Sequence, residues 1–254
     1  MNSMHSASLP PLIAHVVYRF DVGGLENGVV NLINRLPASR WRHAVIALTQ
    51  VAPAMRSRVT RPDVTYVSLD KGPGHLVPLY PRLIRLFREL RPSIVHTRNL
   101  AALEAVVPAR LARVPAVVHG EHGRDADDID GRKVRNLWTR RLFSPFVSRY
   151  VALSSELERY LGDRVGIAPR RITQIINGVD TANFAPRGRE RPALDGCPFA
   201  DPRHFIVGTV GRLDAVKDQT NLARAFVAAL RRHPAARERL RLAIVGDGPL
   251  RDEV

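Results

Sequence analysis

Short, continuously apolar runs alternate along this chain with segments of helical periodicity, and this alternation constrains the fold more than any other feature. Because strands that are apolar on both sides must be covered on both faces, such runs separated by helices indicate a parallel sheet between two helical layers. The sequence therefore predicts an α/β fold that begins with a doubly wound, Rossmann-like domain. The apolar runs span residues 13–18, 43–49, 64–69, 94–97, 116–119, 150–153 and 172–176.

Amphipathic helices are expected between several of these strands. Leucine and phenylalanine recur at steps of three and four residues between positions 83 and 90, with arginines on the other faces. Residues 100–113 and 154–165 have a similar pattern. Either Ser154 or Ser155 is a suitable N-cap for the helix that follows.

The composition changes after about residue 184 and predicts a second unit. The following stretch is rich in proline, glycine and charge, has no periodicity, and is interpreted as a linker or surface loop. A strand at 205–210, a helix at 218–232 and a strand at 242–245 come next. We expect a disordered lead, an N-terminal domain, a linker and an incomplete C-terminal domain over residues 1–11, 12–184, 185–203 and 204–254.

The second unit is too small to be stable alone, because a single βαβ unit of about 50 residues buries too little surface. It must lean on the first domain, associate with another chain, or be the beginning of a larger domain. We favour the last alternative.

The formal net charge is +15, and only three of the 39 basic residues are lysines. A genome-wide bias toward arginine would explain this charge, and so would an anionic binding partner. The basic runs lack interleaved aromatic residues, which argues against nucleic acid. A phosphorylated substrate or an anionic membrane surface fits better. Residues 131–143, the densest basic segment, either lie on lipid headgroups or form an ordinary amphipathic helix on the sheet.

Cysteine content and hydropathy indicate a cytoplasmic protein, or one at the inner face of the cytoplasmic membrane. The single Cys197 excludes an internal disulfide and a cysteine metal cluster. No apolar run approaches the ~18 residues of a membrane span. The N-terminus lacks the basic start and apolar stretch of a signal peptide.

Four loops are expected at the carboxyl ends of strands, where ligands bind in open α/β sheets. "DVGGLENG" follows the first strand, and "HGEHGRD" follows the strand that ends at His119. "GRLDAVKDQ" follows Val210, and "GDGP" follows Val245. Their shared position predicts a binding cleft.

Gly23 and Gly24 remove side chains where a ligand could approach the backbone, and the next helix offers free N–H groups. A tight strand–helix turn, with Glu26 as a favourable first-turn acid, would explain them equally simply. The spacing of Gly23, Gly24 and Gly28 does not match a dinucleotide fingerprint, and the chain has no P-loop.

Arg212 and Lys217 lie five residues apart in a loop that enters a helix, which suits the binding of a diphosphate. The alternative interpretation is that Arg212 and Lys217 are two solvent-exposed cations without a ligand-binding role. The segment 119–130 holds two histidines and five carboxylates, but its spacing is not that of a zinc-enzyme helix. A single polar contact between His119 and a ligand is more plausible than a metal site. Alternatively, His119 is a loop histidine that forms its hydrogen bonds within the protein.

Five stretches occur in the order and at the separations typical of family 4 glycosyltransferases of the GT-B fold, which the chain resembles from Leu12 onward. They are "GGLENGVV", "VVHGEHG", "INGVDTANF", "VGRLDAVKDQ" and "AIVGDGP". More narrowly, "VVYRFDVGGLENG", "HTRNLAALEA" and "HGEHGRD" resemble the sugar transferases associated with PEP-CTERM/exosortase systems and exopolysaccharide loci.

The resemblance implies two facing Rossmann-like domains. The C-terminal domain would bind a nucleotide-sugar donor, and the N-terminal domain would bind a glycan or lipid-linked acceptor. The sugar would be transferred with retention at its anomeric carbon. No metal and no cofactor are expected, because the nucleotide sugar is a substrate.

The resemblance also implies roles for individual residues. Gly23 and Gly24 resemble the loop near the acceptor and donor phosphates. His119 resembles the histidine that contacts the donor sugar and helps its departure. Arg212 and Lys217 resemble the pair that holds the diphosphate. The loop beside the nucleoside is represented by Gly246, Asp247 and Gly248.

The chain departs from the family at its end. The family's second domain continues beyond the GDGP loop and carries an acidic E-x₇-E motif, whereas this sequence ends at Val254. We therefore expect the chain to be weakly active or inactive. Two alternatives stay open: a non-catalytic fragment that docks on an anionic membrane or a partner, and another GT-B enzyme such as a sugar-nucleotide epimerase.

Overall fold

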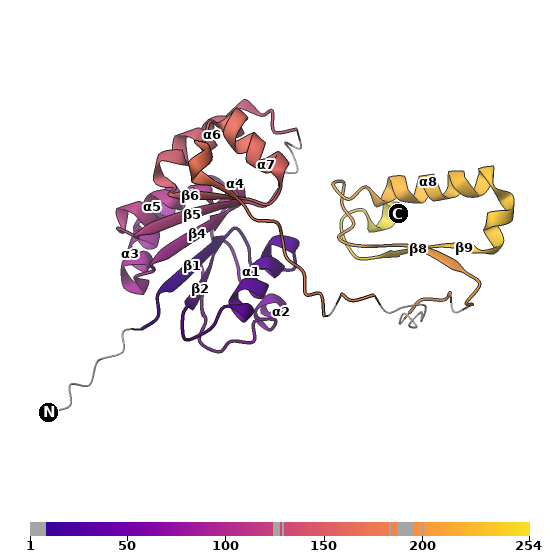
Figure 1. Ribbon diagram of the computed structural model, residues 1–254, viewed down its shortest axis with the longest axis horizontal. Helices are drawn as coiled ribbons and strands as arrows, with labels where there is room; N and C mark the ends of the chain where they lie inside the picture. Colours follow the sequence, from indigo (N-terminus) through magenta and orange to yellow (C-terminus); the bar gives the residue numbers. More distant parts are fainter. Residues whose placement is uncertain (1–8, 124–127, 129, 183, 187–195, 200) are drawn as a thin grey trace. The chain divides into compact units, whose positions relative to one another are not determined.

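The computed structural model describes residues 9–123, 128, 130–182, 184–186, 196–199 and 201–254 (Figure 1). The chain divides into two compact units, unit 1 over residues 1–179 and unit 2 over residues 180–254. Most of the predicted lead and of the predicted linker lies outside the described residues.

Unit 1 is built on a seven-stranded parallel sheet with the strand order β3-β2-β1-β4-β5-β6-β7. The order reverses between β1 and β4, and ligands bind beside such a switch point at the carboxyl ends of the strands. The predicted doubly wound α/β fold is confirmed. The strands are β1 (Leu12–Val17), β2 (Arg42–Ala47), β3 (Thr65–Ser68), β4 (Ile94–Arg98), β5 (Ala116–Glu121), β6 (Arg149–Ala152) and β7 (Ile172–Gln174).

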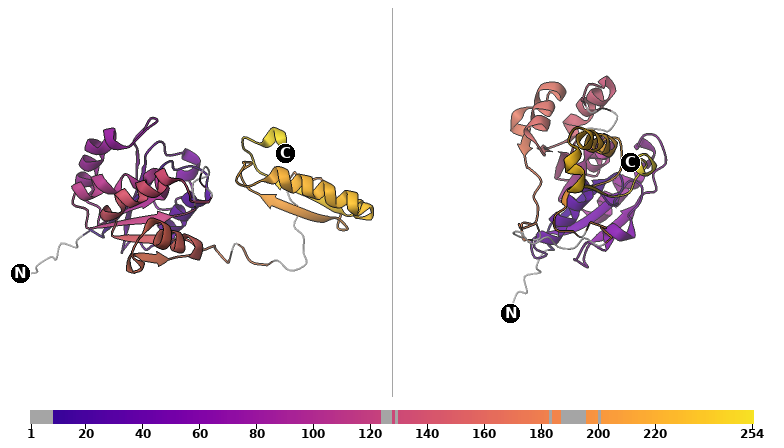
Figure 2. Two further views of the ribbon diagram at one scale, coloured as in Figure 1. Left: turned by 90° about the horizontal axis from the view of Figure 1, so that it is seen from above. Right: turned by 90° about the vertical axis from the view of Figure 1, so that its right-hand side faces the viewer.

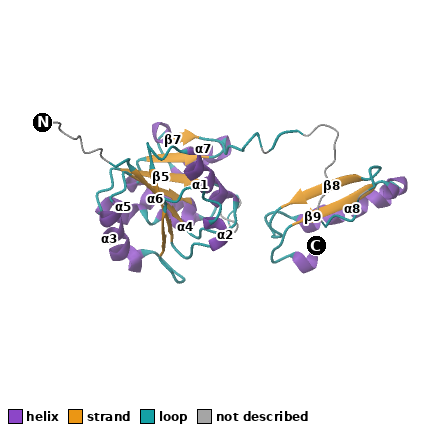
Figure 3. Ribbon diagram, turned by 90° about the horizontal axis from the view of Figure 1, so that it is seen from below, coloured by secondary structure: helices purple, strands orange, loops and turns teal. Residues whose placement is uncertain are grey.

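Helices cover the sheet in two groups (Figures 1 and 3). One face carries α1 (Gly24–Arg35) and α2 (Pro53–Arg56). The other face carries the longer series, which includes the π-helix at Tyr160–Val165. Its α-helices are α3 (Tyr80–Leu90), α4 (Asn99–Leu103), α5 (Val106–Leu111), α6 (Val134–Phe143) and α7 (Ser155–Arg159).

The alternation of side chains along β1 separates two apolar cores. Ala14 and Val16 belong to the large cluster under the longer series of helices, whereas Val17 packs with Val29 and Ile33 of α1. Because successive side chains of a strand point to opposite faces, this alternation assigns every neighbouring residue in register to one of the two faces. We call these the large-core face and the α1 face.

One predicted helix is broken in two. Residues 100–113 were expected as one helix, but the structure has α4 and α5 with a break at Glu104 and Ala105. Pro108 has no N–H to donate to the Glu104 carbonyl. That carbonyl instead accepts from the Tyr80 hydroxyl at 3.1 Å and from the Val107 N–H at 3.3 Å.

Unit 2 is a single parallel βαβ unit. It consists of β8 (Phe205–Val210), α8 (Gln219–Arg232) and β9 (Leu240–Val245), and α8 runs along one face of the strand pair (Figure 2). Among its described residues, only Leu213 and Gln219 are buried. Unit 2 therefore has almost no core of its own.

A search of the helices that the structure describes finds none that is both long and apolar enough to cross a bilayer.

Candidate active site

The twin-glycine loop joins β1 to α1 at the switch point. Gly23 is the N-cap of α1 in an extended conformation, and a Cβ on it would lie 2.3 Å from Glu26 Oε2. A Cβ on Gly24 would meet nothing within 4 Å. The first N–H groups of a helix have no intrahelical partner and can bind an anion. Glu26 lies in the first turn, as the simpler turn interpretation expects, so the loop supports both interpretations.

Arg98 ends β4 beside this loop and is only 4% exposed. Its Nη1 and Nη2 donate to Nδ1 of His15 and Nδ1 of His96, each at 3.3 Å. In the described part of the chain, no carboxylate lies within ion-pair distance of Arg98. Burial lowers the pKa of Arg98 to about 9, and the more distant charge of Glu26 opposes that shift.

The guanidinium fixes the tautomers of the histidines that it contacts. Arginine can only donate, so Nδ1 of His15 and Nδ1 of His96 accept and both rings carry their proton on Nε2. His15 then donates from Nε2 to His43 Nδ1 at 3.0 Å. Burial lowers the pKa of His15 and His96 well below 6.5, with Arg98 as the next cause, and lowers that of His43 to about 4. The three imidazoles are therefore neutral.

Two imidazoles converge on Gly120 of β5. A Cβ at this position would lie 2.7 Å from His122 Nε2 and 3.2 Å from His96 Nε2. Both nitrogens are buried without a hydrogen-bond partner, and so is Nε of Arg98. Arg98 pairs in register with Gly120, so its side chain lies on the same face of the sheet. Polar nitrogens without a partner among the described residues are thus concentrated on the α1 face at the end of β4 and β5.

His119 lies on the opposite, large-core face and is fully buried. Its Nδ1 is 2.8 Å from the Thr97 hydroxyl, and its Nε2 is 3.4 Å from Glu121 Oε1. The edge of its ring meets Tyr150, with ring centroids 5.7 Å apart. These contacts fit a positioned core histidine, and the sugar-contacting role of His119 stays a prediction.

Glu121 forms a buried, two-point ion pair with Arg140 of α6. Arg140 Nε is 2.7 Å from Glu121 Oε1, and its Nη2 is 3.2 Å from Oε2. Burial alone would raise the pKa of Glu121, but His119 and Arg140 lower it to about 2. The carboxylate therefore stays ionised and fastens α6 to the end of β5.

The acidic segment after β5 provides no metal centre among the residues that the structure describes. Asp125 and Asp127 lie outside those residues. Asp128 has a structural role, because its Oδ1 accepts from the backbone N–H groups of Arg132 and Lys133 and its Oδ2 accepts from Asn136. These bonds hold the start of α6.

In unit 2 the Arg212–Lys217 loop follows β8. Arg212 is largely exposed, and its Nε donates to Asp214 Oδ2 at 2.6 Å. The buried Gln219 donates to the Arg212 carbonyl at 3.0 Å, and the Lys217 N–H donates to Asp214. The backbone is thus fixed while both cationic side chains reach solvent.

The glycine loop after β9 packs directly on this cationic loop. A Cβ on Gly246 would lie 1.9 Å from the Gly211 carbonyl oxygen, and one on Gly248 would lie 2.3 Å from that of Leu213. The Leu213 N–H donates to the Asp247 carbonyl at 3.0 Å. Only glycine permits this approach, so these glycines have a structural reason, and their contact with a nucleoside stays a prediction.

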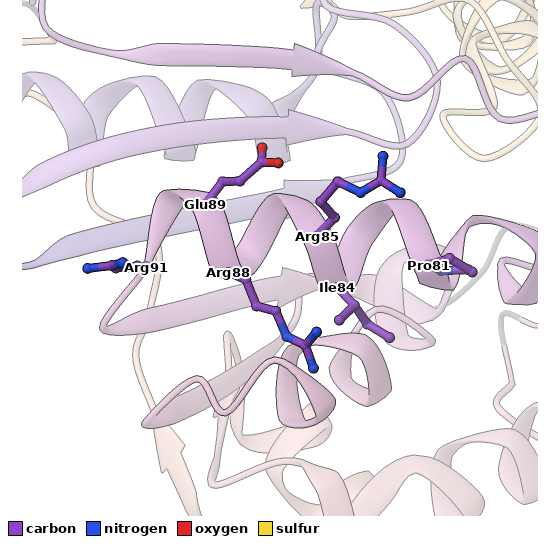
Figure 4. A pocket seen from close by; sticks show the side chains of 6 residues that line it. All are labelled: Pro81, Ile84, Arg85, Arg88, Glu89 and Arg91. Carbon is purple, nitrogen blue, oxygen red and sulfur yellow. The ribbon is translucent and has the colours of Figure 1, made fainter.

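A hollow on the surface of α3 lies elsewhere (Figure 4). Arg91 at its end comes three residues before β4 begins, so the hollow lies toward the amino ends of the strands. Its lining residues are Pro81, Ile84, Arg85, Arg88, Glu89 and Arg91.

The sequence prediction missed Arg98, His15, His43, His96 and Arg140. "HTRN" at the end of an apolar run carried a detectable signal, because an arginine at a strand end in an α/β sheet lies where ligands bind. The pairing of Glu121 with Arg140, 19 residues apart, had no local signal.

Comparison with known proteins identifies the family. The sequence pattern of Glycosyltransferase Family 4 matches residues 22–183. The chain belongs to glycosyltransferase family 4. This family 4 chain is 28% identical over 162 residues to the UDP-Gal:alpha-D-GlcNAc-diphosphoundecaprenol alpha-1,3-galactosyltransferase of Escherichia coli, covering 63% of the chain and 41% of that protein.

A second relative aligns over most of the chain. It is the GDP-mannose-dependent alpha-mannosyltransferase of Mycolicibacterium smegmatis, 28% identical over 249 residues, with 90% of this chain and 60% of that protein covered. The crystal structure of Anabaena HepE with UDP and glucose has a TM-score of 0.66 at 17% identity and covers 95% of this chain and 63% of that one. That likeness shows the fold. The chain thus spans less than two thirds of the length of these proteins.

Proposed function

We propose that this family 4 glycosyltransferase moves a sugar, with retention, from a nucleotide-sugar donor to a lipid-linked or polysaccharide acceptor. The observation that carries the proposal is the gathering of ligand-type residues at the carboxyl ends of parallel strands within a matched family 4 chain. Exopolysaccharide synthesis and the PEP-CTERM/exosortase-associated subgroup are the finer part of the proposal, which rests on the motifs "HTRNLAALEA" and "HGEHGRD".

The donor is proposed to bind at unit 2. Arg212 and Lys217 would hold its diphosphate, and the loop 246–248 would lie beside the nucleoside. Charge builds up on the leaving diphosphate as the glycosidic bond breaks, and a fixed cation stabilises it. The E. coli relative is named for a UDP-galactose donor, and HepE was crystallised with UDP, which supports a UDP-sugar.

The acceptor is proposed to bind at the N-terminal domain, residues 12–184, with 185–203 as linker and 204–254 as donor domain. Gly23 and Gly24 would bring bare backbone to a phosphate, and His119 would act at the sugar. No cofactor and no metal take part in this proposal.

A membrane-borne acceptor is supported by the outer face of α6. Val134, Trp138 and Leu142 recur every four residues and are each more than 60% exposed. Arg135 and Arg141 lie on the same helix, and cations near anionic lipid contribute about 1 kcal/mol each. We propose that this stripe rests on the inner face of the cytoplasmic membrane.

The proposal is tested by transfer of labelled sugar. The purified chain is incubated with labelled UDP-galactose, UDP-glucose or GDP-mannose and an extract of membrane lipids and polysaccharide, and product linkages are read by NMR. A fusion protein is assayed in parallel. In it, the part of a relative that follows the aligned region is joined to the C-terminus of this chain. We expect the product to keep the anomeric configuration of the donor sugar. We also expect the fusion protein to transfer sugar at a much higher rate than the 254-residue chain. Equal turnover would contradict the expected weakness of this chain, and an epimerised nucleotide sugar would indicate an epimerase.

The non-catalytic alternative is favoured only by the α6 stripe and makes a different prediction. A docking fragment would bind anionic vesicles in a manner that weakens with salt, with no donor binding by either protein. Donor binding by the fusion would reject it.

A further inference from the structure

Arg98 is a buried cation that forms no ion pair with any of the residues that the structure describes. At 4% exposure, burial of a charge is costly unless an opposite charge or several hydrogen bonds compensate it. Its described partners are the neutral imidazoles of His15 and His96, at 3.3 Å each. The Nε–H is left without a partner.

The neighbouring donors face the same place. His96 carries its proton on Nε2, because its Nδ1 accepts from Arg98. That Nε2 and the Nε2 of His122 lie 3.2 and 2.7 Å from the point where a Cβ of Gly120 would stand. Neither nitrogen has a partner. The absence of a side chain at Gly120 thus lets two imidazoles pack against its backbone, beside a buried guanidinium.

We propose that Arg98, His96 and His122 bind a phosphate group of the acceptor over Gly120. The guanidinium supplies charge and directed N–H groups, which suit phosphate oxygens. His96 supplies a further N–H donor from its Nε2, and Nε2 of His122 lies beside it as a further polar contact. This inference rests on the proposed function, because it is the acceptor that would bring the phosphate to unit 1, and it narrows the acceptor to phosphorylated or diphosphate-linked compounds.

The proposed phosphate site and the proposed donor diphosphate site consist of different residues. The proposed donor cations, Arg212 and Lys217, belong to unit 2 and are exposed, whereas Arg98 is held in the sheet. His122 lies on the loop after β5 and is partly exposed. Because its ring fills the space over Gly120, we infer that the ring turns to admit a phosphate to Arg98 and contacts the phosphate from the turned position.

Inorganic phosphate is the probe, and thermal unfolding of the 254-residue chain is the first measurement. At equal ionic strength, phosphate should raise the Tm above its value in chloride by about 2–5 °C at a concentration well above its Kd. Arg98→Gln should raise the Kd for phosphate at least ~10-fold, because a charged hydrogen-bond donor is lost. Gly120→Ala should also weaken phosphate binding, because the added methyl group would displace the imidazoles of His122 and His96.

Two control variants match these changes. Arg85→Gln removes an exposed arginine of α3 (Figure 4), and Gly28→Ala adds a methyl group where nothing lies within 4 Å. Both should keep the full phosphate effect. Because Arg98→Gln can also unfold the sheet, the ring ¹⁵N signals of the wild-type protein give a second measurement. Phosphate should move those of His96 and His122, whereas His75 stays unchanged.

A double variant, Arg212→Gln with Lys217→Gln, separates this proposal from the donor site. It should keep the phosphate effect, and UDP should not displace phosphate from the wild-type protein. Loss of the effect in that variant but not in Arg98→Gln would overturn the inference and leave the proposed transferase intact. Displacement by UDP, or unchanged signals of His96 and His122, would also overturn it. Failure of sugar transfer with an intact phosphate response would count against the proposed function alone.

Discussion

The imidazoles of His15, His43 and His96 are buried and neutral, and this makes the stability of unit 1 depend on pH. Their pKa values are lowered from 6.5 by burial, that of His43 to about 4. The unfolded chain therefore binds protons between these pH values, whereas the folded chain does not. The free energy of unfolding should be at its full value above pH 6.5 and fall as the pH approaches 4.

Urea unfolding at pH values from 8 to 4.5 measures this dependence. His43→Gln should flatten the profile, whereas His75→Gln, which changes a largely exposed ring, should leave it unchanged. A profile with equal midpoints at pH 7.5 and pH 5 would contradict the buried neutral state of these histidines.

Replacing only one partner of the Glu121–Arg140 ion pair should lower the free energy of unfolding strongly. Arg140→Met leaves a buried carboxylate without its two-point partner, which costs about 3–5 kcal/mol. Glu121→Gln combined with Arg140→Met should cost much less than Arg140→Met alone, because no buried charge then remains. Urea unfolding of the three proteins measures the coupling.

The exposed pair of Arg203 and Asp201, with N–O contacts of 2.7 Å, provides the control. Arg203→Met should leave the midpoint unchanged, because exposed ion pairs contribute little. If Arg140→Met were as harmless as Arg203→Met, the account of how α6 is attached would be wrong.

Sequence reasoning recognised residues whose chemistry has a local pattern and missed those whose role depends on distant contacts. Gly23 and Gly24 were singled out as candidates because their position after a strand is visible in the sequence. Arg98 was missed because its importance comes from His15, 83 residues away. Burial without an ion pair is a property of packing, which the one-dimensional pattern does not contain.

At the scale of elements, local signals predicted the structure well. All seven strands of unit 1 were predicted to within a few residues, because a parallel sheet imposes continuous apolar runs. The exception is the break between α4 and α5, where Pro108 interrupts a helical pattern. The hydroxyl of Tyr80 satisfies the freed carbonyl of Glu104, and this long-range bond had no sequence signal.

The N-cap of α7 gives a prediction at this scale. Ser154 was one of two candidates, and its Oγ accepts from the Leu157 N–H at 3.2 Å, which confirms it. Ser154→Ala should lower the free energy of unfolding by ~1 kcal/mol, whereas Ser155→Ala should have a smaller effect. Equal losses in the two variants, measured by urea unfolding, would contradict this assignment.

At the scale of the whole molecule, the two units should differ strongly in local stability. Unit 1 has two apolar clusters, whereas unit 2 buries only Leu213 and Gln219 among its described residues. Amide hydrogen exchange reports local opening. Amides of β8 and β9 should exchange orders of magnitude faster than those of β1, β4 and β5. Comparable protection of β8 and β4 would show that unit 2 gains stability from another source.

Transfer of sugar by the fusion tests the central proposal most directly, namely that Arg212 and Lys217 supply the cations that stabilise the departing diphosphate. Arg212→Gln and Lys217→Gln should each lower kcat by ~10²–10³, with the Tm unchanged because both side chains are exposed. Arg231→Gln removes an exposed arginine at the end of α8; it is the control and should retain full activity. Unchanged kcat in both Arg212→Gln and Lys217→Gln would contradict the claim.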